Sequence, residues 1–176
     1  MDWASFLSND ENKSQCVKIL LRVWSSDSQA SKFVGRNVVL VNEGKAFKRT
    51  SPDGVHTVRE ELTEIDSTQE ESDSRMVLYC QYTKDQGYKY VTVKSSDTDV
   101  FFILVYYAKR IENINILFET GRGNKKRLLN ITAFSNDISA VFSSALLCMH
   151  AYMGCDTVSA FKKGRGKLKA LTALQK

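Results

Sequence analysis

The chain has 176 residues, of which 43% are hydrophobic and 26% charged, and its formal net charge is +5 at pH 7. This is the size and composition of one ordinary globular domain with a continuous hydrophobic core. No run of eighteen apolar residues predicts a membrane-spanning helix, and the acidic start lacks the parts of a signal peptide. We therefore expect an intracellular protein that does not bind membranes. We also expect it in the nucleus rather than the cytoplasm.

Acidic and basic residues are unevenly distributed along the chain. Residues 60–73 contain seven acids and no base, whereas ten Lys or Arg residues follow Gly121 and only two acids do. An acidic centre with a basic periphery is typical of a metal site that acts on a polyanion. Two solvated faces of opposite sign explain the same pattern at least as well.

The cysteines indicate reduced buried thiols rather than disulfides or a zinc site. They lie in apolar segments without a Cys-x-x-Cys pair. His150 is close in sequence to two of them, but a single histidine on an apolar helix is expected to be a core or surface residue rather than a metal ligand. The four cysteines are Cys16, Cys80, Cys148 and Cys155.

The first part of the chain predicts one helix and a small set of strands. Apolar residues recur at helical spacing after Asn9, and Asp10 and Glu11 suit the positive end of a helix dipole. The only proline, Pro52, lies in a turn. The expected elements are a frayed start (1–9), a helix (10–25), a buried strand (38–41), a tight turn (42–44), a hairpin partner (45–50), a turn (51–54), an edge strand (55–58) and a loop or short helical turn (60–66).

A crowded acidic segment precedes the next helix, predicted over residues 75–82. Ser67 with Glu70, or Thr68 with Glu71, fits a capping box, which explains one glutamate. It does not explain three neighbouring acids, because close carboxylates repel by roughly 1 to 4 kcal/mol per pair. A strand over residues 88–94 is expected to follow.

Asp97 and Asp99 come directly after this strand. In an extended chain their side chains point to the same side, about 7 Å apart. Ligands of open α/β sheets bind at this carboxyl edge, which favours a metal or catalytic site. Alternatively, Ser96 or Asp97 caps a helix that follows.

The second half of the chain alternates between strands and helices. Residues 100–107 are ambiguous, because β-branched and aromatic residues favour a strand whereas the flanking polar residues suit a capped helix. The other expected elements are a strand (114–119), a tight turn (121–124), a returning strand (126–129) and two helices (131–139 and 143–153), the second ending at Gly154 shortly before Asp156.

Three acidic motifs therefore stand in order around a strand and several helices. They resemble the internal catalytic region of the flap endonuclease and XPG superfamily, which has a PIN-like fold, over about residues 66–162. The likeness is greatest to uncharacterised animal members that carry Glu-Glu-Ala-Asp-Thr-Arg, Ser-x-Asp-Thr-Asp-Val and Gly-Cys-Asp-Ser/Thr. This chain has Glu70-Glu71-Ser72-Asp73-Ser74-Arg75, Ser96-Asp97-Thr98-Asp99-Val100 and Gly154-Cys155-Asp156-Thr157.

The resemblance implies a three-layer α/β/α domain over residues 1–162, with a mostly parallel central sheet, and a basic tail over 163–176. It implies a nuclease that hydrolyses phosphodiester bonds of DNA or RNA with Mg²⁺ or Mn²⁺. The alternative is an inactive domain that binds nucleic acid or protein. The implied catalytic metal ligands are Glu71, Asp73, Asp97, Asp99 and Asp156, and the implied phosphate contacts are Arg122, Lys125, Lys126, Arg127, Lys162, Lys163 and Arg165.

The chain also departs from the family pattern. Family nucleases deliver further metal-binding carboxylates upstream of the helix equated with residues 10–25, where this sequence has only nine residues. Thr157 replaces the usual tyrosine, and a short basic tail stands where DNA-binding helices should follow. We expect a domain without the first N-terminal strand, a fragment or degenerate relative of a longer protein. Residues two apart in a regular helix point about 200° from each other, so Glu71 and Asp73 can share a site only if Glu71 lies at or before the first turn.

Overall fold

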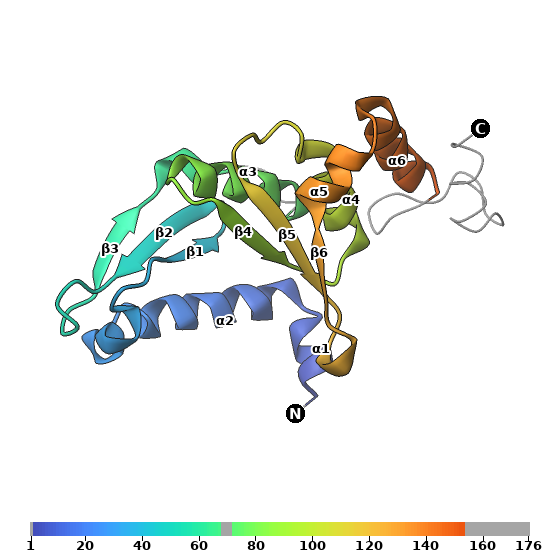
Figure 1. The fold of residues 1–176 in the computed structure, drawn as a ribbon. Helices are drawn as coiled ribbons and strands as arrows, with labels where there is room; N and C mark the ends of the chain where they lie inside the picture. The colour runs from blue at the N-terminus through green and yellow to red at the C-terminus, as the bar shows by residue number, and fades with distance from the viewer. Residues whose placement is uncertain (1, 68–71, 154–176) are drawn as a thin grey trace. The chain divides into compact units, whose positions relative to one another are not determined.

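The computed structural model describes residues 2–67 and 72–153 (Figure 1). The chain is a mixed α/β protein that divides into two compact units, Met1–Glu70 and Glu71–Lys176. We call them the N-terminal and C-terminal units and describe each by itself.

The N-terminal unit begins with two helices, α1 (Trp3–Leu7) and α2 (Asp10–Val23). The predicted helix over 10–25 is confirmed, and the Asn9 side chain accepts the N–H of Asn12 at 3.3 Å as its cap. The expectation of a frayed start is wrong. The Asp2 carboxylate accepts the Ala4 N–H at 3.0 Å and so caps the extra five-residue helix.

A three-stranded antiparallel sheet follows in the order β1-β2-β3. The hairpin between the first two strands is confirmed, and its two-residue turn needs positive φ at Glu43 and Gly44 (51° and 83°). The first strand is half-buried rather than buried, and the third begins three residues later than the start predicted for it. The elements are η1 (Asp27–Phe33), β1 (Val38–Asn42), β2 (Lys45–Thr50), β3 (Val58–Glu61) and η2 (Thr63–Ile65).

The C-terminal unit is built on a sheet of order β4-β5-β6. β4 and β5 are parallel and joined through α4, whereas β5 and β6 form an antiparallel hairpin. The described strands therefore include one parallel pair and not a mostly parallel sheet. The elements are α3 (Ser72–Asp85), β4 (Tyr90–Lys94), α4 (Thr98–Tyr107), β5 (Asn115–Thr120), η3 (Gly123–Lys125), β6 (Arg127–Asn130), α5 (Ile131–Asp137) and α6 (Ala140–Tyr152).

The segment whose secondary structure the sequence left open is helix α4. Its side chains Val100, Leu104 and Val105 are almost fully buried and pack with Ile116 and Phe118 of β5 in the core of the unit. Burial on this scale overrides the β propensity of the segment. The N-terminus of α4 follows the carboxyl end of β4 closely, which positions Asp97 and Asp99 there.

The expectation of buried thiols holds for one of the described cysteines. Cys80 is fully buried, and this burial raises the pKa of its thiol to about 11. Cys16 is half-buried and Cys148 is exposed, so the expectation was wrong for these two; Cys155 lies outside the described residues. No described single helix is long and apolar enough to cross a membrane; α5 and α6, bent by 113° at their junction, pass that test only together and by length and composition alone.

Gly121 is required by the turn between β5 and β6. Its φ is +84°, and a Cβ there would lie 2.2 Å from the carbonyl oxygen of Lys125. Gly121→Ala is therefore expected to lower the free energy of unfolding by about 1–3 kcal/mol, measured by chemical denaturation. Gly123→Ala is the control, because its φ is also positive but nothing lies within 4 Å of its Cβ position. An equal loss in the two variants would contradict the steric explanation.

Candidate metal centre

Three aspartates of the C-terminal unit come together at the N-terminal ends of two helices. Asp73 lies in the first turn of α3, Asp97 is the cap of α4, and Asp99 lies in the first turn of α4. A helix N-terminus favours carboxylates because its unpaired N–H groups carry partial positive charge. Each aspartate, taken separately, is therefore explained by its position at a helix N-terminus.

The same explanation does not account for their proximity. One carboxylate oxygen from each of the three aspartates lies within 4.8 Å of the others, and all three residues are half-buried. Carboxylates this close repel each other by roughly 1 to 3.5 kcal/mol per pair. Carboxylate oxygens are the ligands that hard divalent cations prefer, so the group could hold a metal ion.

Asp97 combines the two roles that the sequence left open. Its Oδ1 accepts the N–H of Asp99 at 2.8 Å, which is the predicted helix cap. Its own N–H donates to Ser95 Oγ at 3.0 Å. Because a carboxylate has two oxygens, the cap holds the side chain in place and leaves its second oxygen for a ligand.

His150 of α6 is the residue of this site that the sequence did not reveal. Its side chain is 4% exposed, and its Nε2 lies 2.6 Å from Oδ1 of Asp99. The ring stacks on Phe102 with centroids 4.3 Å apart. Since a carboxylate can only accept, Nε2 carries the proton and donates, while the buried Nδ1 has no hydrogen-bond partner in the described structure.

His150 was expected to be a core or surface residue; it is buried, and the expectation missed its contact with Asp99. Hydrogen-bonded partners of this kind orient carboxylates that bind metals. His150 and Asp99 are 51 residues apart in the sequence, so no local sequence pattern predicts their contact. Only the packing of α6 in the C-terminal unit creates it.

Two of the five implied ligands, Glu71 and Asp156, lie outside the described residues, as do Thr68 and Glu70 of the predicted capping boxes. The described structure thus brings together Asp73, Asp97 and Asp99. Three of the implied phosphate contacts, Lys162, Lys163 and Arg165, also lie outside it.

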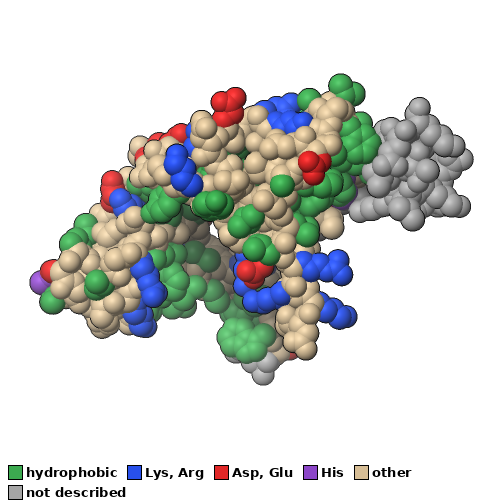
Figure 2. Space-filling view, viewed as in Figure 1, with side chains coloured by type: hydrophobic (Ala, Val, Ile, Leu, Met, Phe, Trp, Pro, Cys, Tyr) green, Lys and Arg blue, Asp and Glu red, His purple; other side chains and the backbone are tan. Residues whose placement is uncertain are grey.

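The other four implied phosphate contacts are exposed and lie around the turn of the β5–β6 hairpin. Because β4 and β5 are parallel, this turn leaves the same edge of the sheet as the segment that carries Asp97 and Asp99. The Ser95 N–H donates to Glu119 O at 3.1 Å, which joins the two segments directly. Figure 2 shows Lys and Arg side chains gathered near the turn end of the hairpin. The four residues are Arg122, Lys125, Lys126 and Arg127.

Glu119 beside this turn is paired with cations rather than with the aspartates. Its Oε1 lies 3.3 Å from Lys94 Nζ and 3.6 Å from Lys126 Nζ. Lys94 lowers the pKa of the Glu119 carboxyl most, and Lys126 lowers it further by a smaller amount. We therefore do not count Glu119 among the candidate ligands.

Comparison of the chain with models of known protein families, with curated proteins and with solved structures found no match.

Proposed function

We propose that the C-terminal unit is the catalytic region of a divalent-metal-dependent nuclease that hydrolyses phosphodiester bonds of DNA or RNA. The convergence of Asp73, Asp97 and Asp99 on one point within 4.8 Å carries this proposal. Three hard oxygen donors suit Mg²⁺ or Mn²⁺. Glu71 and Asp156, which lie outside the described residues, would complete the ligand set.

A bound Mg²⁺ or Mn²⁺ would supply a Lewis acid for the phosphoryl group and a water of lowered pKa. The chain holds the carboxylates ready for this ion. Asp97 is fixed by the Asp99 N–H, and Asp99 is fixed by His150. The basic turn of the β5–β6 hairpin would hold the phosphates of the substrate at the same edge of the sheet.

We further propose that this region is PIN-like and related to the flap endonuclease and XPG superfamily. The order of elements supports the relationship: an acid opens α3, β4 follows, and an acid pair comes directly after β4 at the start of α4. β5 is parallel to β4, so the connection between them, which contains α4, crosses one face of the sheet, as an α/β fold requires.

The alternative function is a binding module without catalysis. The exposed basic turn favours it, because phosphate contacts by Lys and Arg need no metal ion. Such a module would bind nucleic acid equally well in EDTA and in Mn²⁺. Its affinity would also not change when Asp97 and Asp99 are replaced.

The nuclease proposal is tested by incubating the chain with end-labelled flap and single-stranded DNA and RNA in Mg²⁺ or Mn²⁺. Cleavage is expected in the wild type and in a Glu112→Gln/Asp137→Asn control, which removes two exposed acids of the same unit. The Asp97→Asn/Asp99→Asn variant should not cleave above the level in EDTA. Equal products from this variant and the wild type would exclude the proposed site and indicate a contaminating nuclease.

The basic turn makes a separate prediction about salt dependence. The slope of log affinity against log salt is negative, and each lost phosphate contact reduces its magnitude by about 0.7–0.9. Arg122→Gln/Arg127→Gln should therefore reduce the magnitude of the slope by about 1.4–1.8 for a labelled oligonucleotide, measured by fluorescence anisotropy in EDTA. The control is Lys84→Gln/Lys89→Gln: Lys84 lies in the last turn of α3, and Lys89 directly precedes β4, at the edge of the sheet opposite the basic turn. Equal slopes in both double variants would mean that the turn has no special part in binding.

A further inference from the structure

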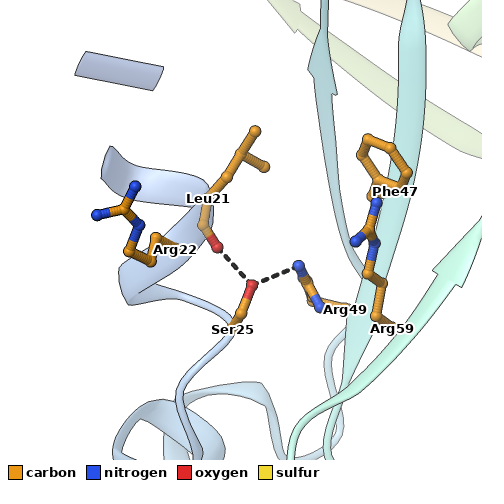
Figure 3. A pocket seen from close by; sticks show the side chains of 6 residues that line it. All are labelled: Leu21, Arg22, Ser25, Phe47, Arg49 and Arg59. Carbon is orange, nitrogen blue, oxygen red and sulfur yellow. Dashed lines mark hydrogen bonds between the residues drawn. The ribbon is translucent and has the colours of Figure 1, made fainter. Parts of the chain in front are cut away.

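The N-terminal unit contains a pocket of about 230 Å³ that the proposed nuclease does not use. It lies between the C-terminal end of α2 and strands β2 and β3 (Figure 3). Three of its six lining residues are arginines and none is acidic. The lining residues are Leu21, Arg22, Ser25, Phe47, Arg49 and Arg59.

Arg49 is the unusual residue of this pocket. It is 4% exposed, and its Nη2 donates to Ser25 Oγ at 2.5 Å. Its Nε is buried without a hydrogen-bond partner in the described structure. Burial lowers the pKa of Arg49, and the charge of Arg59 lowers it further. A buried charge normally has an ion-pair partner, because burying it alone is costly.

Arg59, on the neighbouring strand β3, places a second positive charge beside Arg49. It lies directly opposite Arg49 in the register of β2 and β3, and its guanidinium stacks on the Phe47 ring at 3.9 Å. Like charges directly opposite each other destabilise a sheet. Figure 3 shows both guanidinium groups on the side of β2 that faces Ser25, whereas the Arg22 guanidinium points away from Arg49.

No described carboxylate forms an ion pair with Arg49 or Arg59. The neighbouring acids of β3 already have partners: Glu60 lies 3.1 Å from Lys48 Nζ and Glu61 lies 2.8 Å from Lys45 Nζ. Within residues 2–67 and 72–153 neither guanidinium group therefore has an ion-pair partner, although the charge of Arg59 contributes to the lowered pKa of Glu61. An anion in the pocket would compensate them.

We propose that this pocket binds a phosphate group between Arg49 and Arg59. Guanidinium groups bind phosphate through paired N–H donors, and Arg49 and Arg59 both line the pocket. Two positive charges match a phosphate dianion, whereas a single carboxylate would leave one of them uncompensated. The volume corresponds to about seven or eight water molecules in the liquid and is below the roughly 300 Å³ of typical ligand pockets. It therefore suits a phosphate carried on a small group.

The test is a titration of the full chain with inorganic phosphate, followed by the melting temperature and by isothermal titration calorimetry. EDTA is present throughout, so that no metal ion at the aspartates can hold phosphate. Sodium chloride of equal ionic strength separates site binding from screening. We expect a saturable rise of the melting temperature with phosphate and none with chloride.

The variant Arg59→Gln should weaken phosphate binding about tenfold or more, because it removes a charge-assisted contact from an exposed residue whose loss the fold tolerates. Arg36→Gln is the matched control, since Arg36 is exposed in the same unit and does not line the pocket. A dinucleotide with a 5′-phosphate should also bind, and the same dinucleotide without it should not, if the phosphate is presented on a nucleic acid end. Inorganic phosphate binding alone would identify free phosphate as the ligand. A non-saturable response, or equal binding by the wild type and Arg59→Gln, would overturn the proposal.

Discussion

In EDTA, the chain carrying Asp97→Asn and Asp99→Asn is expected to melt several degrees above the wild type. The two substitutions remove the repulsion among three carboxylates whose oxygens lie within 4.8 Å of one another. Each pair contributes about 1 kcal/mol in water and about 3.5 kcal/mol at an effective dielectric of about 20. A gain of 1 kcal/mol raises the melting temperature of a unit of this size by about 4–8 °C.

Asparagine retains the structural contacts of both residues. It caps helices as well as aspartate does, and its side-chain oxygen can still accept the His150 donor. The lost attraction between Asp99 and the dipole of α4 costs only about 0.3–1 kcal/mol. The net effect is therefore stabilisation, which acids that serve only as caps would not produce.

Mn²⁺ should stabilise the wild type more than the double variant and so act against this difference. A ligand at 100 times its Kd stabilises the native state by about 2.7 kcal/mol, and only the wild type retains the charged ligands. The exposed-acid control, Glu112→Gln/Asp137→Asn, should behave as the wild type does in both conditions. The three acids would be structural if the double variant melted below the wild type in EDTA. They would also be structural if Mn²⁺ raised the melting temperature of the double variant as much as that of the wild type.

Replacing His150 with phenylalanine is expected to weaken Mn²⁺ binding by about 10–100-fold, the usual effect of losing a partner that orients a metal ligand. Phenylalanine preserves the buried ring and its stacking on Phe102, so the fold should persist. The loss would come from Asp99, whose Oδ1 no longer receives the Nε2–H donor. Mn²⁺ affinity is measured by calorimetry and stability by urea denaturation.

His150→Gln separates orientation from packing. The glutamine amide can place a donor near the position of Nε2, so this variant should regain most of the Mn²⁺ affinity that His150→Phe loses. His150→Ala should instead cost about 3–5 kcal/mol of stability, because it leaves a cavity where a buried ring was. If His150→Phe binds Mn²⁺ as tightly as the wild type, the contact with Asp99 is only a packing feature.

Local patterns predicted most of the elements. The hairpins over β1–β2 and β5–β6 follow from tight-turn residues between two short segments that contain apolar residues, and α2 follows from its capping Asn9 and its apolar spacing. The extra helix α1 was missed because it has only five residues; the Asp2 carboxylate caps it, and Asn12 Nδ2 donates to Phe6 O. Helix α4 was ambiguous because propensity and capping disagree there, and burial of its apolar residues decides between them.

The candidate centre was predictable only in part. Asp97 and Asp99 follow a strand closely enough for a sequence pattern to place them together, and Asp73 joins them through the packing of α3 near α4. His150 approaches Asp99 only because α6 packs in the same unit. Arg49 and Arg59 lie opposite each other because of the register between β2 and β3. This register was not predicted, and the start of β3 was predicted three residues too early.

The most direct test of the account is a calorimetric titration of Mn²⁺ into the full chain. The wild type and the Glu112→Gln/Asp137→Asn control are expected to bind Mn²⁺ saturably, and Asp97→Asn/Asp99→Asn to bind at least about 100-fold more weakly, since it removes two ligands rather than a partner of one. Saturable binding of equal affinity in all three proteins, or no binding by the wild type, would contradict a metal centre at Asp73, Asp97 and Asp99.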